Sequence, residues 1–393
     1  MDSADDICPR PQRLLPQATQ PHAPPIYLSS VYECLDPEQA DALLGGREQG
    51  YVYARDGHPN ADLLAEKCRQ LHDTERATIA GSGMAALAAV VLSQLAPGDH
   101  VVVSDQLYGR TLLLFSGEAA RLGITSTQVD ICNLAAVEQA MSERTRMIVV
   151  ETISNPLLRV ADLAALANLA HAHGATLLAD NTFASPAVCR PRQWGADWVM
   201  ESLTKIMNGH SDVILGLLCG PAARWQRVPA VLSTWGLASA PFDCWLAMRG
   251  LGTMALRVER ASTNALAAAR LLIDSPGVAA VYYPGLPDHP DHAVARRQFG
   301  EHFGSIVSFT LSGGLDAARA FITAAHRIPF CPSLGELSTT LSHPESTSHR
   351  ALTPQERSRL GIAGGTIRLS VGIESTSAVL AALAEGLAGL GAT

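Results

Sequence analysis

Apolar and polar residues alternate along the chain in two distinct patterns. Short, nearly continuous apolar runs, such as residues 100–105 and 146–154, are typical of buried strands. Between them lie longer segments in which apolar residues recur with helical spacing, for example 83–96 and 161–174. Further strands are predicted over 124–130, 175–180, 196–202 and 213–220, and further helices over 61–71, 111–123 and 133–142. This alternation predicts a mainly parallel sheet with helices on both faces.

The pattern changes on either side of this α/β region. Residues 1 to about 60 are predicted to be irregular, because "PQATQPHAPP" is too rich in proline for a helix or a central strand. Beyond residue 250, a long helix over 257–272 precedes shorter segments of both strand and helix type, which predicts a smaller α+β domain. We therefore expect an N-terminal arm over 1–60, a large α/β domain over 61–255 and a C-terminal α+β domain over 256–393.

The composition narrows the class of protein. With 393 residues, of which 47% are hydrophobic, the chain has enough apolar material for a large core. Its net charge is -8 and no basic block stands out, so nucleic acid is not expected as a partner. The acidic start "MDSADDICPRPQ" does not resemble a targeting peptide, and the longest apolar run, "MAALAAVVLSQLA", is too short to span a membrane. A soluble, cytoplasmic protein without a membrane partner is expected.

The eight cysteines are scattered along the chain, and none forms a C-x-x-C pair. Zinc-binding cysteines normally occur in clusters, so no metal site is predicted. Several of these cysteines lie in apolar segments, as Cys219 does in "ILGLLCG". We expect reduced and mostly buried thiols.

Polar side chains gather at the ends of predicted strands, where ligands bind in sheets of this kind. In "ESLTKIMNGHSDVILG", Lys205 follows the strand over 196–202, and Asp180 follows the run "ATLLA". Gly83 and Met84 open a predicted helix, whose N–H groups and dipole favour a phosphate. A lysine, an acid and a phosphate site together fit pyridoxal phosphate (PLP), which needs a lysine for its Schiff base and an acid for its ring nitrogen.

Other residues near these strand ends would complete such a site. Ser202 and Thr204 lie beside Lys205 and could hold phosphate oxygens, and the ring of Tyr108 could stack on the cofactor. Each feature alone has a structural explanation, because a lysine is usually on the surface and an aspartate after a strand is usually a turn residue. The PLP hypothesis depends on these features occurring together.

A series of nine segments makes the hypothesis specific. In chain order they are "YARDGHPN", "GSGMAA", "DQLYGRT", "ETISNP", "LADNTFASP", "ESLTKIMNGHSDVILG", "MRGLGTMALR", "CPSLGE" and "IRLSVGIES". The series resembles the signature of the Cys/Met-metabolism PLP enzymes, which include cystathionine γ-synthase, cystathionine γ-lyase, methionine γ-lyase and O-acylhomoserine sulfhydrylase. The resemblance extends from about residue 20 to about residue 385 and implies the PLP-dependent transferase fold of type I.

The resemblance also implies a role for each matching residue. Lys205 would form the Schiff base and then act as acid and base, beside Tyr108 as the second catalytic residue. The residues placed around the cofactor are Tyr53, Arg55, Gly83, Met84, Tyr108, Asp180, Thr182, Ser202, Thr204 and Lys205. Tyr53 and Arg55 would reach the site of the neighbouring subunit, which implies a homodimer or a homotetramer. The substrate would contact Asn155, Ser333, Ser338 and Arg368, with Arg368 holding its α-carboxylate.

The chain departs from the family pattern at positions near the predicted substrate. Arg110 stands where relatives often have glycine, or cysteine in methionine γ-lyases, and Leu113 stands where cystathionine γ-synthases tend to have arginine. Ser338 aligns with a glutamate that faces the distal end of the substrate in many members. Glu336 and Glu345 lie nearby but out of register with that glutamate.

The predicted reaction is elimination or replacement at Cβ or Cγ of a sulfur- or oxygen-substituted amino acid. Our first interpretation is a carbon–sulfur lyase of the methionine or cystathionine γ-lyase type. The alternative is γ-replacement, as in cystathionine γ-synthase or O-acylhomoserine sulfhydrylase. An aminotransferase or racemase on the same fold, and a regulatory protein that holds PLP without turnover, are further alternatives. Because Ser338 is uncharged, we expect methionine, homocysteine or an O-acylhomoserine to be preferred over cystathionine.

Overall fold

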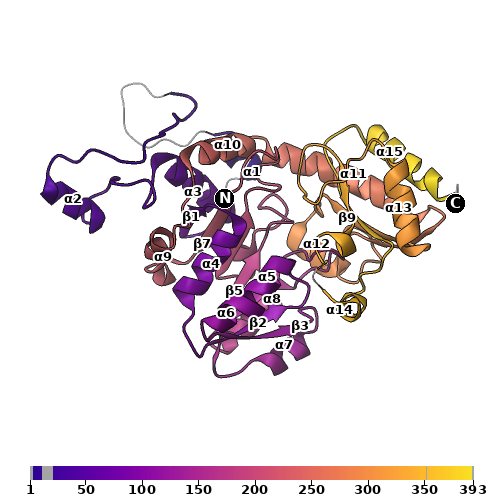
Figure 1. Cartoon of the computed structure of the whole chain (residues 1–393), viewed down its shortest axis with the longest axis horizontal. Coiled ribbons are helices and arrows are strands. Elements are labelled where there is room, and N and C mark those ends of the chain that lie inside the picture. The colour runs from indigo at the N-terminus through magenta and orange to yellow at the C-terminus, as the bar shows by residue number, and fades with distance from the viewer. Residues whose placement is uncertain (1–2, 11–20, 351, 392–393) are drawn as a thin grey trace.

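The computed structural model describes residues 3–10, 21–350 and 352–391. Its strands form two separate sheets (Figure 1). One sheet has seven strands in the order β1-β7-β6-β5-β4-β2-β3, and the other has four strands in the order β10-β11-β9-β8. This architecture confirms the predicted fold class, a large and mainly parallel sheet domain followed by a smaller domain of helices and strands. Within the described residues, no helix is both long and apolar enough to cross a membrane.

The strands of the large sheet are β1 (Arg76–Ala80), β2 (His100–Ser104), β3 (Thr125–Val129), β4 (Thr145–Glu151), β5 (Thr176–Asp180), β6 (Trp198–Ser202) and β7 (Gly216–Gly220). Neighbouring strands from β3 to β6 are parallel, whereas β7 runs antiparallel to both β6 and β1. Every residue of β2 and of β7 is buried. Burial on both faces explains why these strands are continuous apolar runs in the sequence.

Helices cover both faces of the large sheet (Figure 1). One face packs against α4 (Gly83–Gln94), α5 (Gly109–Leu113) and α9 (Val228–Thr234), and the other against α3 (Pro59–His72), α8 (Leu163–Ala172) and α10 (Pro241–Leu251). Along β2, Val101 and Val103 belong to one hydrophobic cluster and Val102 to the other, because alternate side chains of a strand point to opposite faces. The helix predicted over 111–123 is interrupted by a π-helical turn at Leu114–Glu118, after which α6 (Ala119–Arg121) follows. This part of the chain also contains α7 (Leu134–Ala140) and two short 3-10 helices, Pro191–Trp194 and Ala222–Arg224.

The N-terminal region is more regular than predicted. It contains the short helices α1 (Ala4–Ile7) and α2 (Pro37–Leu44), so the prediction of irregular structure is wrong for these residues. The Asp36 side chain caps α2 by accepting a hydrogen bond from Gln39 N at 2.7 Å, and Pro37 lies in the first turn, where a missing N–H is tolerated. The segment around α2 extends away from the body of the molecule (Figure 1). Residues 16–20 of the proline-rich stretch lie outside the described residues.

The smaller sheet is antiparallel and consists of β8 (Val278–Tyr282), β9 (Ile306–Leu311), β10 (Thr340–Ser342) and β11 (Thr366–Ser370). It packs against α11 (Met254–Ile273), α13 (Gly314–Ala324) and α15 (Thr376–Ala388). Side chains from these elements, including Phe309, Phe321, Leu369 and Leu383, form a separate hydrophobic core. Figure 1 shows this domain beside the carboxyl-terminal part of α11, and the short helix α14 (Pro354–Arg359) lies at its edge.

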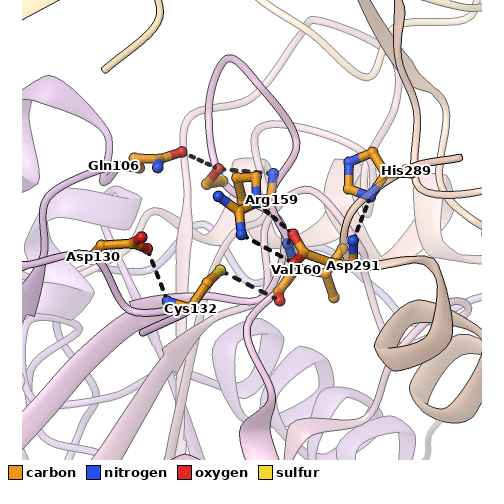
Figure 2. A network of polar contacts seen from close by, with 8 residues as sticks. Gln106, Asp130, Cys132, Arg159, Val160, His289 and Asp291 are labelled. Atoms are coloured by element: carbon orange, nitrogen blue, oxygen red, sulfur yellow. Dashed lines mark hydrogen bonds and ion pairs between the residues drawn. The ribbon is translucent and has the colours of Figure 1, made fainter. Parts of the chain in front are cut away.

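A polar network joins the loop after β4 to the segment before α12 (His292–Phe299), as Figure 2 shows. Arg159 donates hydrogen bonds from Nε and Nη2 to the two carboxylate oxygens of Asp291, at 2.6 and 3.1 Å. The N–H of Val160 donates to the same carboxylate at 3.0 Å. The network therefore fixes the far end of the loop over residues 154–160 against a segment that is distant in sequence.

Candidate active site

A cavity of about 290 Å³ lies at the carboxyl ends of β4, β5 and β6. The first turn of α4, the start of α5 and residues of the smaller domain complete its wall. The predicted site residues that line it are Gly83, Met84, Tyr108, Asn155, Asp180, Thr182, Ser202, Thr204, Lys205, Ser333 and Arg368. The structure therefore brings together most of the residues that the sequence singled out, at the edge where parallel sheets bind ligands.

Lys205 lies in the turn that follows β6. Its Nζ donates a hydrogen bond to Ser333 Oγ at 2.8 Å. Burial lowers the pKa of Lys205, while the charge of Glu336 opposes this effect and that of Arg368 adds to it. A lowered pKa makes the neutral amine more accessible, and only the neutral amine can act as a nucleophile or a base.

Asp180 is the last residue of β5. Its Oδ1 accepts hydrogen bonds from Thr182 N at 2.9 Å and from Thr182 Oγ1 at 2.5 Å. Thr182 Oγ1 also accepts a hydrogen bond from Ser202 N at 2.9 Å, which connects the ends of β5 and β6. Burial raises the pKa of Asp180 to about 6, although the Thr182 bonds favour the ionised form. Pairing with a protonated ring nitrogen requires the ionised form, which the two Thr182 hydrogen bonds favour.

The first turn of α4 can bind an anion. Ser82 caps the helix, because its Oγ accepts a hydrogen bond from Ala85 N at 3.0 Å, and the N–H groups that follow are directed to the helix end. A Cβ atom at Gly83 would lie 3.0 Å from the Ser202 Cβ, so a larger residue at position 83 would crowd the Ser202 side chain. Ser202 and Thr204 both line the cavity at this point. Backbone N–H groups and two hydroxyl groups suit a phosphate.

Arg368 lies on β11 and is buried. Its Nη1 donates to Asn155 Oδ1 at 3.0 Å and its Nη2 donates to the Ser333 carbonyl oxygen at 2.9 Å. Among the described residues, its buried Nε has no hydrogen-bond partner. Burial lowers the pKa of Arg368 to about 10, so the guanidinium stays charged at neutral pH. A buried cation with unused N–H donors suits a carboxylate.

Glu151, the last residue of β4, also lines the cavity, and the sequence had not singled it out. Its two carboxylate oxygens accept hydrogen bonds from Tyr108 N at 2.6 Å and from Asn155 N at 3.2 Å. The ring of Tyr108 lies in the cavity wall and is 42% exposed. The position of Glu151 within "ETISNP", at the end of a strand, was the available signal.

Three predicted site residues lie elsewhere in the described chain. Tyr53 and Arg55 do not line the cavity; the Arg55 guanidinium lies 4.9 Å from the centre of the Tyr53 ring on the N-terminal arm. Ser338 is exposed and is not among the lining residues either. Their predicted roles, in the neighbouring subunit's site and at the distal end of the substrate, stay predictions.

The lining groups fit PLP. Lys205 supplies an amine for the aldehyde, and Asp180 supplies a carboxylate for the ring nitrogen. The start of α4 supplies an anion site for the phosphate, and the absence of a side chain at Gly83 lets Ser202 lie beside it. The remaining cation, Arg368, lies within the same cavity and is not needed for any of these contacts.

The family model for Cys/Met metabolism PLP-dependent enzymes matches residues 10–388. The chain belongs to this family. The match includes both sheets and all the lining residues, and it establishes PLP as the cofactor. The resemblance that the nine sequence segments indicated is therefore confirmed.

Several members of the Cys/Met-metabolism family are similar over nearly their full length. The O-succinylhomoserine sulfhydrylase of Pseudomonas aeruginosa is 39% identical over 379 residues, which cover 96% of this chain and 93% of that protein. The L-methionine γ-lyase of Fusobacterium nucleatum subsp. polymorphum is 38% identical, with 93% of each chain covered. The structure of cystathionine γ-synthase from Xanthomonas oryzae pv. oryzae in complex with cystathionine has a TM-score of 0.94 at 36% identity and covers 100% of both chains. These relatives are named for three different reactions.

Proposed function

We propose that this PLP-dependent enzyme carries out elimination or replacement at Cβ or Cγ of a sulfur- or oxygen-substituted amino acid. We propose as its main reaction carbon–sulfur cleavage of the methionine or cystathionine γ-lyase type, with methionine preferred. The preference for methionine is supported by the residues that line the cavity. Among the described residues, its carboxylates are Glu151 and Asp180, and other groups already donate hydrogen bonds to both. The apolar lining residues include Met84, Ile153, Phe183, Met200, Ile214 and Leu334.

This lining favours a substrate whose distal end is uncharged. The apolar side chains can cover the methyl thioether of methionine and exclude water from it. The distal ammonium of cystathionine would lose its hydration on entering such a site, and a buried charge without a partner is costly. The resemblance implies a glutamate at position 338 as that partner, but this chain has an exposed serine there, and Glu336, whose charge acts on Lys205 and Arg368, does not line the cavity.

Proton transfer is assigned to Lys205. When bound, PLP withdraws electrons from the substrate Cα and so makes its proton removable. Lys205 Nζ takes this proton, and burial lowers the pKa of Lys205 toward the range in which the neutral amine is available. For a leaving group on Cγ, Lys205 would first have to pass the Cα proton on to the cofactor; its amine, neutral again, could then remove a second proton from Cβ. Ser333 Oγ, 2.8 Å from Nζ, orients the amine.

Substrate orientation is assigned to Arg368. A guanidinium has five N–H donors, and the hydrogen bonds to Asn155 and Ser333 use two of them. The remaining donors can hold the α-carboxylate in a two-point contact. This contact fixes the amino acid at one end, while its side chain extends along the apolar lining.

Cofactor binding is assigned to the strand ends and to the arm of a second subunit. In one subunit, Asp180 binds the ring nitrogen, Tyr108 stacks on the ring and Thr182 orients Asp180. Gly83, Met84, Ser202 and Thr204 bind the phosphate. Tyr53 and Arg55 would reach the phosphate in the neighbouring subunit, because they lie outside the cavity of their own chain. This arrangement requires a homodimer or a homotetramer, and exposed apolar residues on the arm, such as Leu28 and Leu35, suit an interface.

The division of the chain and its location belong to the same proposal. The arm would span residues 1–60, the cofactor domain 61–255 and the C-terminal domain 256–393. All eight cysteines are free in the structure, which is typical of a protein that works in a reducing compartment such as the cytoplasm.

A second candidate is γ-replacement on an O-acylated homoserine. It is favoured by the sulfhydrylase from Pseudomonas aeruginosa, which is 39% identical over nearly the whole chain. An O-acylhomoserine would use the same Arg368 contact and the same proton transfers, because its leaving group is also on Cγ. The two candidates differ in what happens after the leaving group departs.

The test is a turnover panel with PLP-loaded enzyme. Methionine, homocysteine, cystathionine and O-succinylhomoserine with cysteine are offered separately, and keto acid, ammonia and thiol are measured. We expect keto acid, ammonia and methanethiol from methionine, with kcat/KM at least about tenfold above that for cystathionine, because a neutral partner replaces a charged one. Transfer of cysteine to the homoserine derivative without keto acid from methionine would favour replacement instead.

The lysine can be tested separately, because the chain contains only Lys67 and Lys205. Borohydride reduction followed by peptide mapping should place the cofactor on Lys205. Lys67 is buried, and its Nζ donates to the Cys8 carbonyl oxygen at 2.7 Å. Lys67→Arg is therefore the matched control and should still be labelled, whereas Lys205→Ala should not. Label on Lys67 would overturn the assignment.

A further inference from the structure

Glu151 is a buried carboxylate in the cavity wall that the proposed reaction does not use. Neither proton transfer nor substrate binding has been assigned to it, and Asp180 already serves the ring nitrogen. It is 7% exposed, and no solvent-facing role is available to it. Its hydrogen bonds go to the main chain of two other cavity residues, Tyr108 and Asn155.

Tyr108 and Asn155 serve different parts of the proposed site: Tyr108 stacks on the cofactor, and Asn155 orients Arg368, which binds the substrate carboxylate. Tyr108 is the residue before α5, and no side chain caps that helix. The short bond from Tyr108 N to Glu151 Oε1, 2.6 Å, therefore fixes where the ring enters the cavity. Asn155 lies in the loop after β4, and its Oδ1 accepts the hydrogen bond from Arg368 Nη1 at 3.0 Å.

A carboxylate is the group that this arrangement requires. Two N–H donors approach two separate oxygens, so both can be satisfied only if both atoms are acceptors. In a glutamine, one of the oxygens is replaced by an NH₂ group, which would face an N–H donor. The side chain would then move away from that donor, and because it holds both residues, its connections to Tyr108 and to Asn155 would both weaken.

We propose that Glu151 is a positioning residue that fixes Tyr108 and Asn155 relative to each other, so that one side chain sets both the ring-stacking face and the Arg368 carboxylate site. This inference rests on the proposed function, because it uses the roles of Tyr108 and Arg368. It adds that cofactor binding by Tyr108 and substrate binding by Arg368 both depend on one side chain, that of Glu151. Asp180 lies directly beside Glu151 in the strand register. Burial and the charge of Asp180 raise the pKa of Glu151, while the hydrogen bonds from Tyr108 N and Asn155 N and the charge of Arg368 oppose this effect.

The first test measures PLP binding without turnover. Apoenzyme with Glu151→Gln is titrated with PLP, and the dissociation constant is read from cofactor absorbance. We expect it to rise about tenfold, the effect of weakening one buried hydrogen bond. If the Gln variant does not fold, Glu151→Asp, which keeps both oxygens on a shorter side chain, is measured in the same way and should show a smaller rise.

The second test measures how tightly a substrate analogue binds at the Arg368 carboxylate site. Norleucine keeps the amine and carboxylate of methionine but has no leaving group, so its binding is read as a spectral change of the holoenzyme. We expect Glu151→Gln to weaken norleucine binding about tenfold. Asn155→Ala should weaken it as well, and the double variant should be little worse than either single variant, since both act through Arg368.

Glu201 provides the matched control. It is also a buried glutamate near the end of a strand, β6, but it pairs with His72 and Asn181 and does not line the cavity. Glu201→Gln should lower the melting temperature and leave both binding constants within twofold of wild type. A Glu151→Gln variant that changes only one of the two binding constants, or is additive with Asn155→Ala, would overturn the link. Neither binding assay depends on which substrate is turned over, so failure of the proposed reaction would be seen separately.

Discussion

Substitution of Asp291 by asparagine tests how the loop after β4 is supported (Figure 2). In the wild type, Asp291 accepts two hydrogen bonds from Arg159 and one from Val160 N. Asparagine keeps the shape and one oxygen, so the Val160 contact can survive, but its NH₂ group would face the guanidinium. We expect lower stability and weaker substrate binding, because Asn155 in the same loop orients Arg368.

The size of the effect follows from the hydrogen bond of Arg159 Nη2, which is lost, because Nε shares the surviving oxygen with Val160 N. A hydrogen bond to a charged group contributes about 1.5–3 kcal/mol, and the Nε bond is also weakened because its acceptor is no longer charged. The Arg159 side chain is 28% exposed, so water can replace part of the interaction. We therefore expect the free energy of unfolding to fall by about 2 kcal/mol. In a chain of this length that corresponds to a melting temperature lower by roughly 2–4 °C.

A second ion pair at the same interface serves as the control. Arg297 on α12 contacts Asp162 at 2.7 Å, but the two side chains are 48% and 28% exposed. Exposed pairs of this kind contribute below about 1 kcal/mol, so Arg297→Gln should have a small effect. The double variant Arg159→Gln/Asp291→Asn should lose about as much stability as Asp291→Asn alone, because both changes remove the same contact.

The assays are urea unfolding and thermal unfolding of the PLP-loaded variants under identical conditions, together with KM and kcat for the substrate that the turnover panel identifies. We expect KM to rise in Asp291→Asn with little change in kcat. Two results would refute the reasoning: an Arg297→Gln variant as destabilised as Asp291→Asn, or losses in the double variant that are the sum of the single ones. An unchanged KM would show that the loop does not need this support to orient Arg368.

Two further predictions concern the arm and the response to acid. If Arg55 binds the phosphate of PLP in the neighbouring subunit, Arg55→Ala should raise the dissociation constant for PLP about tenfold. The control is Arg47→Ala, which removes an exposed arm residue paired with Asp41 and should leave this constant unchanged. A fully active monomer would contradict the prediction. Burial, with a smaller contribution from the Arg368 charge, lowers the pKa of His349 to about 4. Since histidine in the unfolded chain has a pKa of about 6.5, the unfolded state binds more protons between these values, and stability falls as the pH decreases through this range. Between pH 7 and pH 4.5, the free energy of unfolding of His349→Gln should therefore fall by about 2–3 kcal/mol less than that of the wild type, as measured by urea unfolding. An equal fall in both proteins would show that His349 is protonated in the folded protein.

The sequence was sufficient for the features that follow from local pattern. The strands β2 and β4 were predictable because burial on both faces requires continuous apolar runs. Lys205 and Asp180 could be placed at one edge because the carboxyl ends of parallel strands meet there. The antiparallel direction of β7 was not predictable in this way, since a buried antiparallel strand has the same apolar composition as a parallel one.

Features that depend on long-range contacts could not be predicted. The helix α2, a local feature, was missed because the whole region up to residue 60 was predicted to be irregular from its proline-rich stretch, although that stretch ends before α2 and Pro37 is acceptable in the first turn. The position of Glu151 at the end of a strand indicated that it lies near the site but not what it does there, because its partners are main-chain N–H groups, which every residue except proline carries. The pairing of Arg159 with Asp291 joins positions that are far apart in the chain, and many other arginines and aspartates could have been paired equally well.

Ser333 explains how one scaffold can serve several reactions. Its Oγ accepts the hydrogen bond from Lys205 Nζ in the large domain, and its carbonyl oxygen accepts that from Arg368 Nη2 in the smaller one. Nearby Gly335 has φ +83°, and a Cβ there would lie 2.6 Å from Ile206 N, so the segment can approach the lysine turn only with glycine at this position. The spacing between the proposed proton-transfer group and the proposed carboxylate site is thereby set by one short segment. Recognition of the α-amino acid part is then independent of the apolar lining around the side chain, so the lining can change between relatives while the amine and the guanidinium keep their separation.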